Sequence, residues 1–205
     1  MVSNCERSSG STSFRVLVLC TANVCRSPLA AVLMREHLRA HESSITIESA
    51  GILVLESSPM CEGAACFAGV DLRAHESREA TFESLDSADL ILTADRTQRA
   101  WAARQRPDSR SRTLTLRQAA QSGSWIAGQI AAGEVPPGAD PLPSDQIARL
   151  RWLVQEMNAG RALAGAHAQD VQDRHGPADH TPTFTMVGDV AADIANAMLL
   201  VLASK

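Results

Sequence analysis

The chain has 205 residues, of which 45% are apolar, so it is long enough and apolar enough to bury a core and fold as one globular domain. Its formal net charge of −4 argues against a nucleic-acid-binding or anionic-membrane surface, and we expect no apolar run long enough to span a membrane. Five cysteines without the spacing of a disulfide framework, and a start that lacks the apolar stretch of a secretory signal, favour a reducing cytoplasm.

Predicted strands and helices alternate along the first half of the chain. Residues 1–13 are mostly small, polar or charged and predict a flexible tail. The apolar run Phe14–Leu19 is typical of a strand buried on both faces, and further short strands are expected at Ile45–Ile47, Leu90–Thr93 and Arg112–Leu116. Helices are expected after the first strand, at Pro59–Gly69 and around Thr97–Arg104. This alternation predicts an α/β fold with a doubly wound, four-stranded parallel sheet and helices on both faces.

The second half of the chain predicts a loop and two amphipathic helices. Residues 122–144 are rich in Gly, Pro, Ser and Ala, which favours a loop insertion. Two apolar stripes with helical spacing follow. The first consists of Ile147, Leu150, Val154 and Met157, and the second of Met186, Val190, Ile194, Met198 and Val201. We therefore expect a single domain over residues 14–205.

The segment from Cys20 to Arg26 carries the chemistry. It connects the end of the first strand to a helix that Ser27 can cap and that Pro28 suits in its first turn. Main-chain N–H groups of such a loop converge on one point and bind an anion. The expected phosphate-binding residues are Thr21, Ala22, Asn23, Val24, Cys25 and Arg26. The same donors favour the thiolate form of Cys20, whose simplest alternative is a buried strand residue.

Five stretches of the sequence resemble the low-molecular-weight protein tyrosine phosphatase family, which includes thioredoxin-coupled arsenate reductases. They are Val18–Pro28, Glu48–Gly51, Gly69–Leu72, His75–Arg78 and Ala88–Thr93. The resemblance extends to about Leu116 and is weak beyond it.

This resemblance implies roles for individual residues. Cys20 would attack a phosphomonoester and form a cysteinyl-phosphate intermediate, and the Arg26 guanidinium would hold two phosphate oxygens. Residues that support the loop would form a polar network, namely Asn23, Ser27, Ser49 and His75. Each member of the network could instead be an ordinary cap or surface residue.

Two positions in the loop bear on its shape and its chemistry. Ala22 stands where the family usually has Gly, so the loop closes normally only if this residue keeps a negative φ. Cys25 could form a reversible disulfide with Cys20, as such a pair can in the family, or could be a small buried side chain.

The proton donor for the leaving group has two candidates. By resemblance it is an Asp, typically in an Asp-Pro-aromatic loop late in the chain. Asp140 is followed by Pro, but the aromatic is missing and a long segment follows. Asp173 has the right place before the last helix, although Arg174 replaces Pro, and His175 stands where an aromatic would flank the substrate. We favour Asp173, because a final helix can position its loop while the Gly/Pro-rich stretch lengthens at little cost.

Other activities fit less well. Arsenate reduction needs two more thiols to relay a disulfide, but Thr93–Arg96 contains none and no cysteine follows Cys66. A protein-arginine phosphatase would have Thr where this chain has Val24. A non-catalytic phosphate-binding module also remains an alternative.

We expect no cofactor and no metal site, because the cysteine and histidine spacings are not those of metal ligands. The sequence therefore predicts a cytoplasmic protein tyrosine phosphatase. Its expected partners are a phosphorylated protein or small phosphomonoester, and a cognate tyrosine kinase, with no nucleic acid or membrane.

Overall fold

The computed structural model describes residues 13–162, 170–172 and 180–204. Its strands are β1 (Phe14–Cys20), β2 (Ile45–Gly51), β3 (Leu90–Thr93) and β4 (Thr113–Thr115). Its α-helices are α1 (Arg26–His37), α2 (Glu62–Ala68), α3 (Phe82–Ser87), α4 (Arg96–Gln105), α5 (Leu116–Ala131), α6 (Gln146–Ala159) and α7 (Thr181–Ala203).

The four strands form one parallel sheet in the order β2-β1-β3-β4. Strand β1 is central, with Val16 paired to Ile47 on one side and to Leu90 on the other. Because the strands are parallel, their carboxyl ends lie at one edge of the sheet, which brings the loop after β1 beside the loops after β2 and β3.

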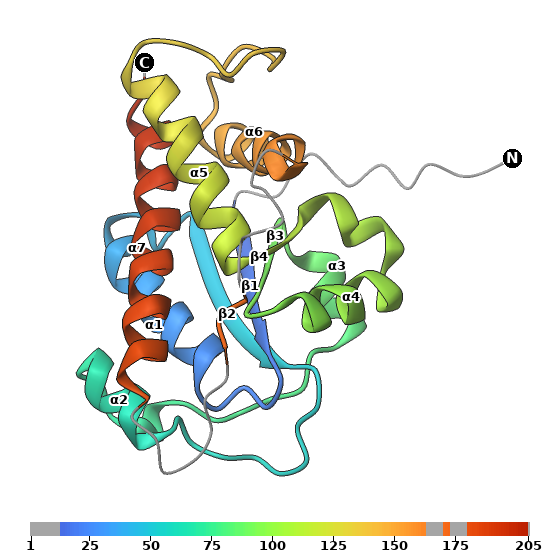
Figure 1. Cartoon of the computed structure of the whole chain (residues 1–205), viewed down its shortest axis with the longest axis vertical. Helices are drawn as coiled ribbons and strands as arrows, with labels where there is room; N and C mark the ends of the chain where they lie inside the picture. Colours follow the sequence, from blue (N-terminus) through green and yellow to red (C-terminus); the bar gives the residue numbers. More distant parts are fainter. Residues whose placement is uncertain (1–12, 163–169, 173–179, 205) are drawn as a thin grey trace, which may run out of the picture.

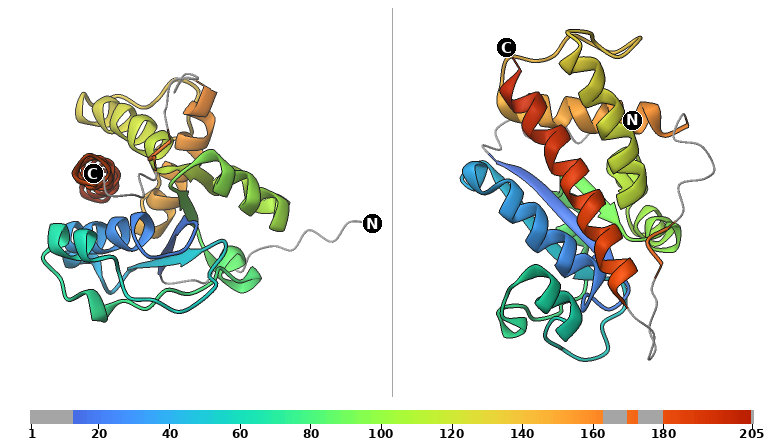
Figure 2. Two further views of the ribbon diagram at one scale, coloured as in Figure 1. Left: turned by 60° about the horizontal axis from the view of Figure 1, so that its bottom comes forward. Right: turned by 60° about the vertical axis from the view of Figure 1, so that its left-hand side comes forward.

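Helices cover both faces of this sheet, as Figures 1 and 2 show. Phe14, Val16 and Val18 of β1 share a hydrophobic core with residues of α1, α5, α6 and α7. Leu17 and Leu19 point to the other face, in a smaller core with residues of α3 and α4. The alternation along β1 explains its continuous apolar sequence, and the predicted doubly wound α/β fold is confirmed.

Helix α7 corrects one expectation from the sequence. Within the described residues it is long and apolar enough to cross a membrane by length and composition alone, although no such run was expected. Half of its most apolar 18-residue stretch is buried inside the fold. Ile194 and Met198, on its buried stripe, belong to the main core shared with α1 and α5, which accounts for its apolar character.

Helix α5 corrects a second expectation. The predicted loop at 122–144 is wrong over its first ten residues, because α5 continues to Ala131. Gly123 is small because α6 and α7 approach closely: a Cβ at this position would lie 2.7 Å from Met157 Cε and 3.2 Å from Ala197 Cβ. A composition typical of loops thus serves close helix packing here.

Candidate active site

The loop between β1 and α1 presents its main-chain groups in two directions. The carbonyl oxygens of four of its residues accept hydrogen bonds from outside the loop, and these residues are Cys20 (from Ile52 N), Thr21 (from Leu53 N), Asn23 (from His75 Nε2) and Val24 (from Cys61 N). Within the described residues, the N–H groups of Thr21, Ala22, Asn23 and Val24 donate to no protein acceptor. These N–H groups therefore form a set of unpaired donors, which is what an anion requires. We call residues 20–26 the phosphate loop.

Cys20 lies at the start of this loop, at the carboxyl end of the central strand. Its side chain is buried, and its Sγ atom lies 3.0 Å from Ser27 Oγ. Cys25 is also buried.

Asn23 holds the loop in shape. It is fully buried and has a φ of 57°, a left-handed conformation that Asn tolerates better than most residues. Its Nδ2 donates to Ser27 Oγ and to Ser49 Oγ, each at 2.9 Å, and its Oδ1 accepts from Arg78 N at 3.1 Å.

The loop-supporting residues predicted from the sequence thus lie together. His75 completes the group, with Nε2 2.7 Å from the Asn23 carbonyl oxygen, which fixes Nε2 as the protonated nitrogen. Partial burial lowers the pKa of His75, which favours this neutral form. Arg78 was missed by the sequence reasoning, because it reaches Asn23 through a main-chain N–H that carries no sequence signal.

The departure at Ala22 leaves the backbone unstrained. Among the described residues other than Gly, only Asn23 has a positive φ, so Ala22 keeps a conformation that suits its Cβ. The close approach occurs instead at Gly51. A Cβ there would lie 2.6 Å from the Thr21 carbonyl oxygen and 2.6 Å from Val54 Cγ2.

Arg26 joins the phosphate loop to two other segments. Its buried Nη1 donates to Asp95 Oδ2 at 3.3 Å and to the Val171 carbonyl at 3.0 Å. Val171 in turn donates its N–H to the Ala94 carbonyl at 3.0 Å, at the end of β3. Asp95 was missed by the sequence reasoning, although its place directly after β3, the neighbour of β1, is the signal that could have found it.

The two candidate proton donors are placed differently. Asp173 lies outside the described residues, but Val171, two residues before it, contacts Arg26. Asp140 is exposed, and its carbonyl accepts from Trp152 Nε1. Helix α5 leads from the carboxyl end of β4 to the opposite end of the sheet, so loop 132–145 lies at the top of Figure 1 and the phosphate loop at the bottom. Asp140 is therefore remote from Cys20.

Apolar side chains lie exposed beside the phosphate loop. Leu53 is 55% exposed and Leu55 is 86% exposed, and the N–H of Leu53 donates to the Thr21 carbonyl at 3.0 Å. Gln98, which is buried, donates from Nε2 to Thr21 Oγ1 at 3.2 Å. An exposed apolar segment thus joins the phosphate loop through the main chain of Leu53. Within the described residues, no group of three His, Cys, Asp or Glu side chains could hold a metal ion.

Comparisons with known proteins show which family the chain resembles. The family model for low molecular weight phosphotyrosine protein phosphatase matches residues 15–127. The low molecular weight protein-tyrosine-phosphatase Etp of Escherichia coli (strain K12) is 34% identical over 136 residues, which cover 65% of this chain and 80% of Etp. A protein-arginine-phosphatase of Geobacillus stearothermophilus is 29% identical over 108 residues, which cover 51% of this chain and 70% of that protein.

Among solved structures, a protein tyrosine phosphatase from Entamoeba histolytica matches with a TM-score of 0.58. The match covers 91% of this chain and 95% of that one. At 14% identity this likeness shows the fold.

Proposed function

The chain belongs to the low molecular weight phosphotyrosine protein phosphatase family, and we propose that it hydrolyses phosphotyrosine in proteins through a cysteinyl-phosphate intermediate on Cys20. The observation that carries the proposal is the set of unpaired N–H groups at Thr21–Val24, directly after Cys20 and in the same loop as Arg26. A phosphoryl group held by these donors would lie next to Sγ.

The first step breaks the ester bond. Cys20 Sγ attacks phosphorus, the S–P bond forms, and the P–O bond to the tyrosine oxygen breaks. Ser27 can donate its hydroxyl proton toward Sγ, because its oxygen already accepts from Asn23 Nδ2. The loop N–H groups and Arg26 offset the charge that develops on the phosphoryl oxygens. Asp173 gives its proton to the departing phenolate.

The second step regenerates the thiolate. Water attacks phosphorus, Asp173 takes the proton, and the S–P bond breaks to release inorganic phosphate. Support for Asp173 over Asp140 comes from Val171, which places the chain beside Arg26 two residues before Asp173. A tyrosine kinase that generates the substrate is the expected partner.

Tyrosine phosphate is favoured over arginine phosphate by the surroundings of the loop. The phosphate group is the same, so the discrimination comes from the surface that receives the rest of the residue. The exposed Leu53 and Leu55 side chains suit the apolar face of a phenyl ring, and Val24 adds no polar group.

The test compares wild type with Cys20→Ser on three substrates: a phosphotyrosine peptide, a phosphoarginine peptide and arsenate with thioredoxin. We expect turnover of the phosphotyrosine peptide by wild type alone. Faster turnover of the phosphoarginine peptide would show that the protein is an arginine phosphatase. Turnover of none of the three substrates would show a non-catalytic phosphate-binding protein.

A further inference from the structure

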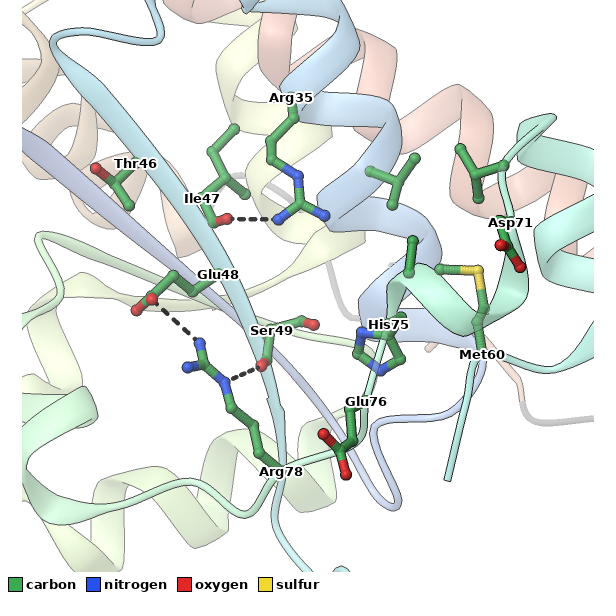
Figure 3. A pocket seen from close by; sticks show the side chains of 13 residues that line it. Arg35, Thr46, Ile47, Glu48, Ser49, Met60, Asp71, His75, Glu76 and Arg78 are labelled. Atoms are coloured by element: carbon green, nitrogen blue, oxygen red, sulfur yellow. Dashed lines mark hydrogen bonds and ion pairs between the residues drawn. The ribbon is translucent and has the colours of Figure 1, made fainter. Parts of the chain in front are cut away.

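A surface groove of about 460 Å³ lies next to the residues that support the phosphate loop. It is bounded by α1, the outer edge of β2 and residues 70–78 (Figure 3). His75 and Ser49 line the groove, and both form hydrogen bonds with Asn23 of the phosphate loop. The groove and the loop therefore share these two residues as a common wall.

The outer edge of β2 offers this groove hydrogen-bond donors. Alternate residues of the strand turn their main-chain groups outward, as Gly51 does when its N–H donates to the Arg78 carbonyl. The Ile47 carbonyl accepts from Arg35 Nη1 at 3.0 Å, and the Ser49 carbonyl accepts from Arg78 Nε at 3.1 Å. In the described part of the chain the N–H groups of Ile47 and Ser49 have no acceptor. The arginines therefore satisfy the acceptors of the edge and leave its donors available.

The charges around this edge are unevenly compensated. Arg78 forms an ion pair with Glu48 at 3.2 Å, whereas Arg35 forms none with the residues the structure describes. Partial burial lowers the pKa of Arg35, the nearby Arg78 lowers it further, and Glu48 acts in the opposite direction. The same two guanidinium groups add to the effect of burial in lowering the pKa of His75. Arg35 and Arg78 thus bring two guanidinium groups to this end of the groove, where Glu48 offsets part of their charge.

The remaining carboxylates of the groove are engaged elsewhere. Glu76 accepts from Ser57 Oγ at 2.8 Å, and Asp71 accepts from Arg73 N at 2.9 Å. Asp71 lies beside Met60, at the end of the groove away from Arg78 (Figure 3). An anion between the arginines would therefore not displace either carboxylate.

We propose that this groove is a second oxyanion-binding site, which takes a phosphate, sulfate or carboxylate group between Arg35, Arg78 and the outward N–H groups of Ile47 and Ser49. The binding does not depend on the proposed catalytic activity. It is linked to the phosphate loop, since Arg78 N and His75 Nε2 both bond to Asn23. An anion bound in the groove would interact with the Arg78 guanidinium. It would thereby affect the position of Arg78, whose main-chain N–H donates to Asn23.

The test is an amide NMR titration of ¹⁵N-labelled full-length Arg26→Ala protein, in which the grip of the phosphate loop on anions is weakened. Sodium sulfate and sodium acetate are added separately, with sodium chloride at equal ionic strength as the reference. We expect saturable shifts of the Ile47 and Ser49 amides. The anion that binds more tightly shows whether the natural ligand of the groove carries a phosphate-like group or a carboxylate.

Two variants in the same background locate the site. Arg35→Gln should weaken binding about tenfold or more, because it removes the charged donor. Arg39→Gln is the matched control, since Arg39 is an exposed arginine of the next turn that pairs with Glu36, and it should leave binding unchanged. Shifts no larger than those in chloride, or equal loss of binding in both variants, would overturn the proposal.

Discussion

The Sγ atom of Cys20 lies 3.0 Å from the Oγ atom of Ser27. Ser27 Oγ also accepts from Asn23 Nδ2, so its own proton can point to the sulfur at 3.0 Å or to the Ala50 carbonyl at 3.5 Å, and the shorter contact favours the sulfur. The proposed nucleophile is therefore tied to Asn23 through one hydroxyl group, and the shape of the phosphate loop and the state of the thiol depend on the same contacts.

Substitution of Asn23 should separate two contributions to this arrangement. Asn23→Ala removes two buried side-chain hydrogen bonds and a part-buried one, and puts at a positive φ a residue that tolerates this conformation less well than Asn, so we expect the free energy of unfolding to fall by about 2–4 kcal/mol. Asn23→Gly removes the same bonds without the backbone cost and should be about 1 kcal/mol more stable than Asn23→Ala. Urea denaturation measures both, and an Asn23→Ala protein as stable as wild type would contradict the account.

The structure also predicts a pH dependence from His75. Its pKa in the folded protein lies below the usual 6.5, chiefly because of burial, so the unfolded chain takes up the proton more readily. This contribution to stability is complete above about pH 6.5 and is lost as the pH falls toward the folded-state pKa. We expect His75→Gln to flatten this part of the curve, while substitution of the exposed His37 by Gln leaves it unchanged. Thermal denaturation between pH 5 and 8 tests this, and equal slopes in all three proteins would count against it.

Arg26→Lys should lose about a hundredfold or more in kcat/KM on a phosphotyrosine peptide. The planar guanidinium can bond to Asp95, to the Val171 carbonyl and to phosphate oxygens together, whereas an ammonium group has no such fixed fork. Arg39→Lys, on the exposed surface, is the control. A loss of less than about tenfold would mean that Arg26 acts only as a charge.

The identity of the proton donor is tested by leaving-group dependence. A donor matters most for a poor leaving group, so Asp173→Asn should slow phenyl phosphate strongly and p-nitrophenyl phosphate less. Asp140→Asn should slow neither, because Asp140 lies at the opposite end of the sheet. Steady-state rates of both variants on both substrates decide the question. Selective loss in Asp140→Asn would show that the Asp-Pro dipeptide was the better guide.

The parts of the fold that local sequence determines could be predicted. An apolar strand ending in Cys20 and a helix beginning near Arg26 are local patterns, and so the sheet and the phosphate loop followed from them. The later part of α5, residues 122–131, was wrongly predicted as a loop, because the small size of Gly123 answers to the close approach of Met157 and Ala197, which are distant in sequence.

The same distinction holds within the site. Asn23 lies inside the loop and Ser27 directly follows it, and both were predicted by resemblance, whereas Asp95 and Arg78 contact Arg26 and Asn23 from 69 and 55 residues away. Arg78 reaches Asn23 through its main chain, and only the three-dimensional structure shows such a contact. The groove beside β2 likewise depends on two arginines that come together only in the fold.

The most direct test of the central proposal is to trap the intermediate. Wild-type protein is mixed with excess p-nitrophenyl phosphate, quenched within milliseconds, digested and analysed by mass spectrometry. We predict a phosphoryl group on the sulfur of Cys20, and none on this residue or any other in a Cys20→Ala control. Turnover that leaves Cys20 unmodified at every quench time, or that persists in Cys20→Ala, would contradict the proposal that Cys20 is the nucleophile.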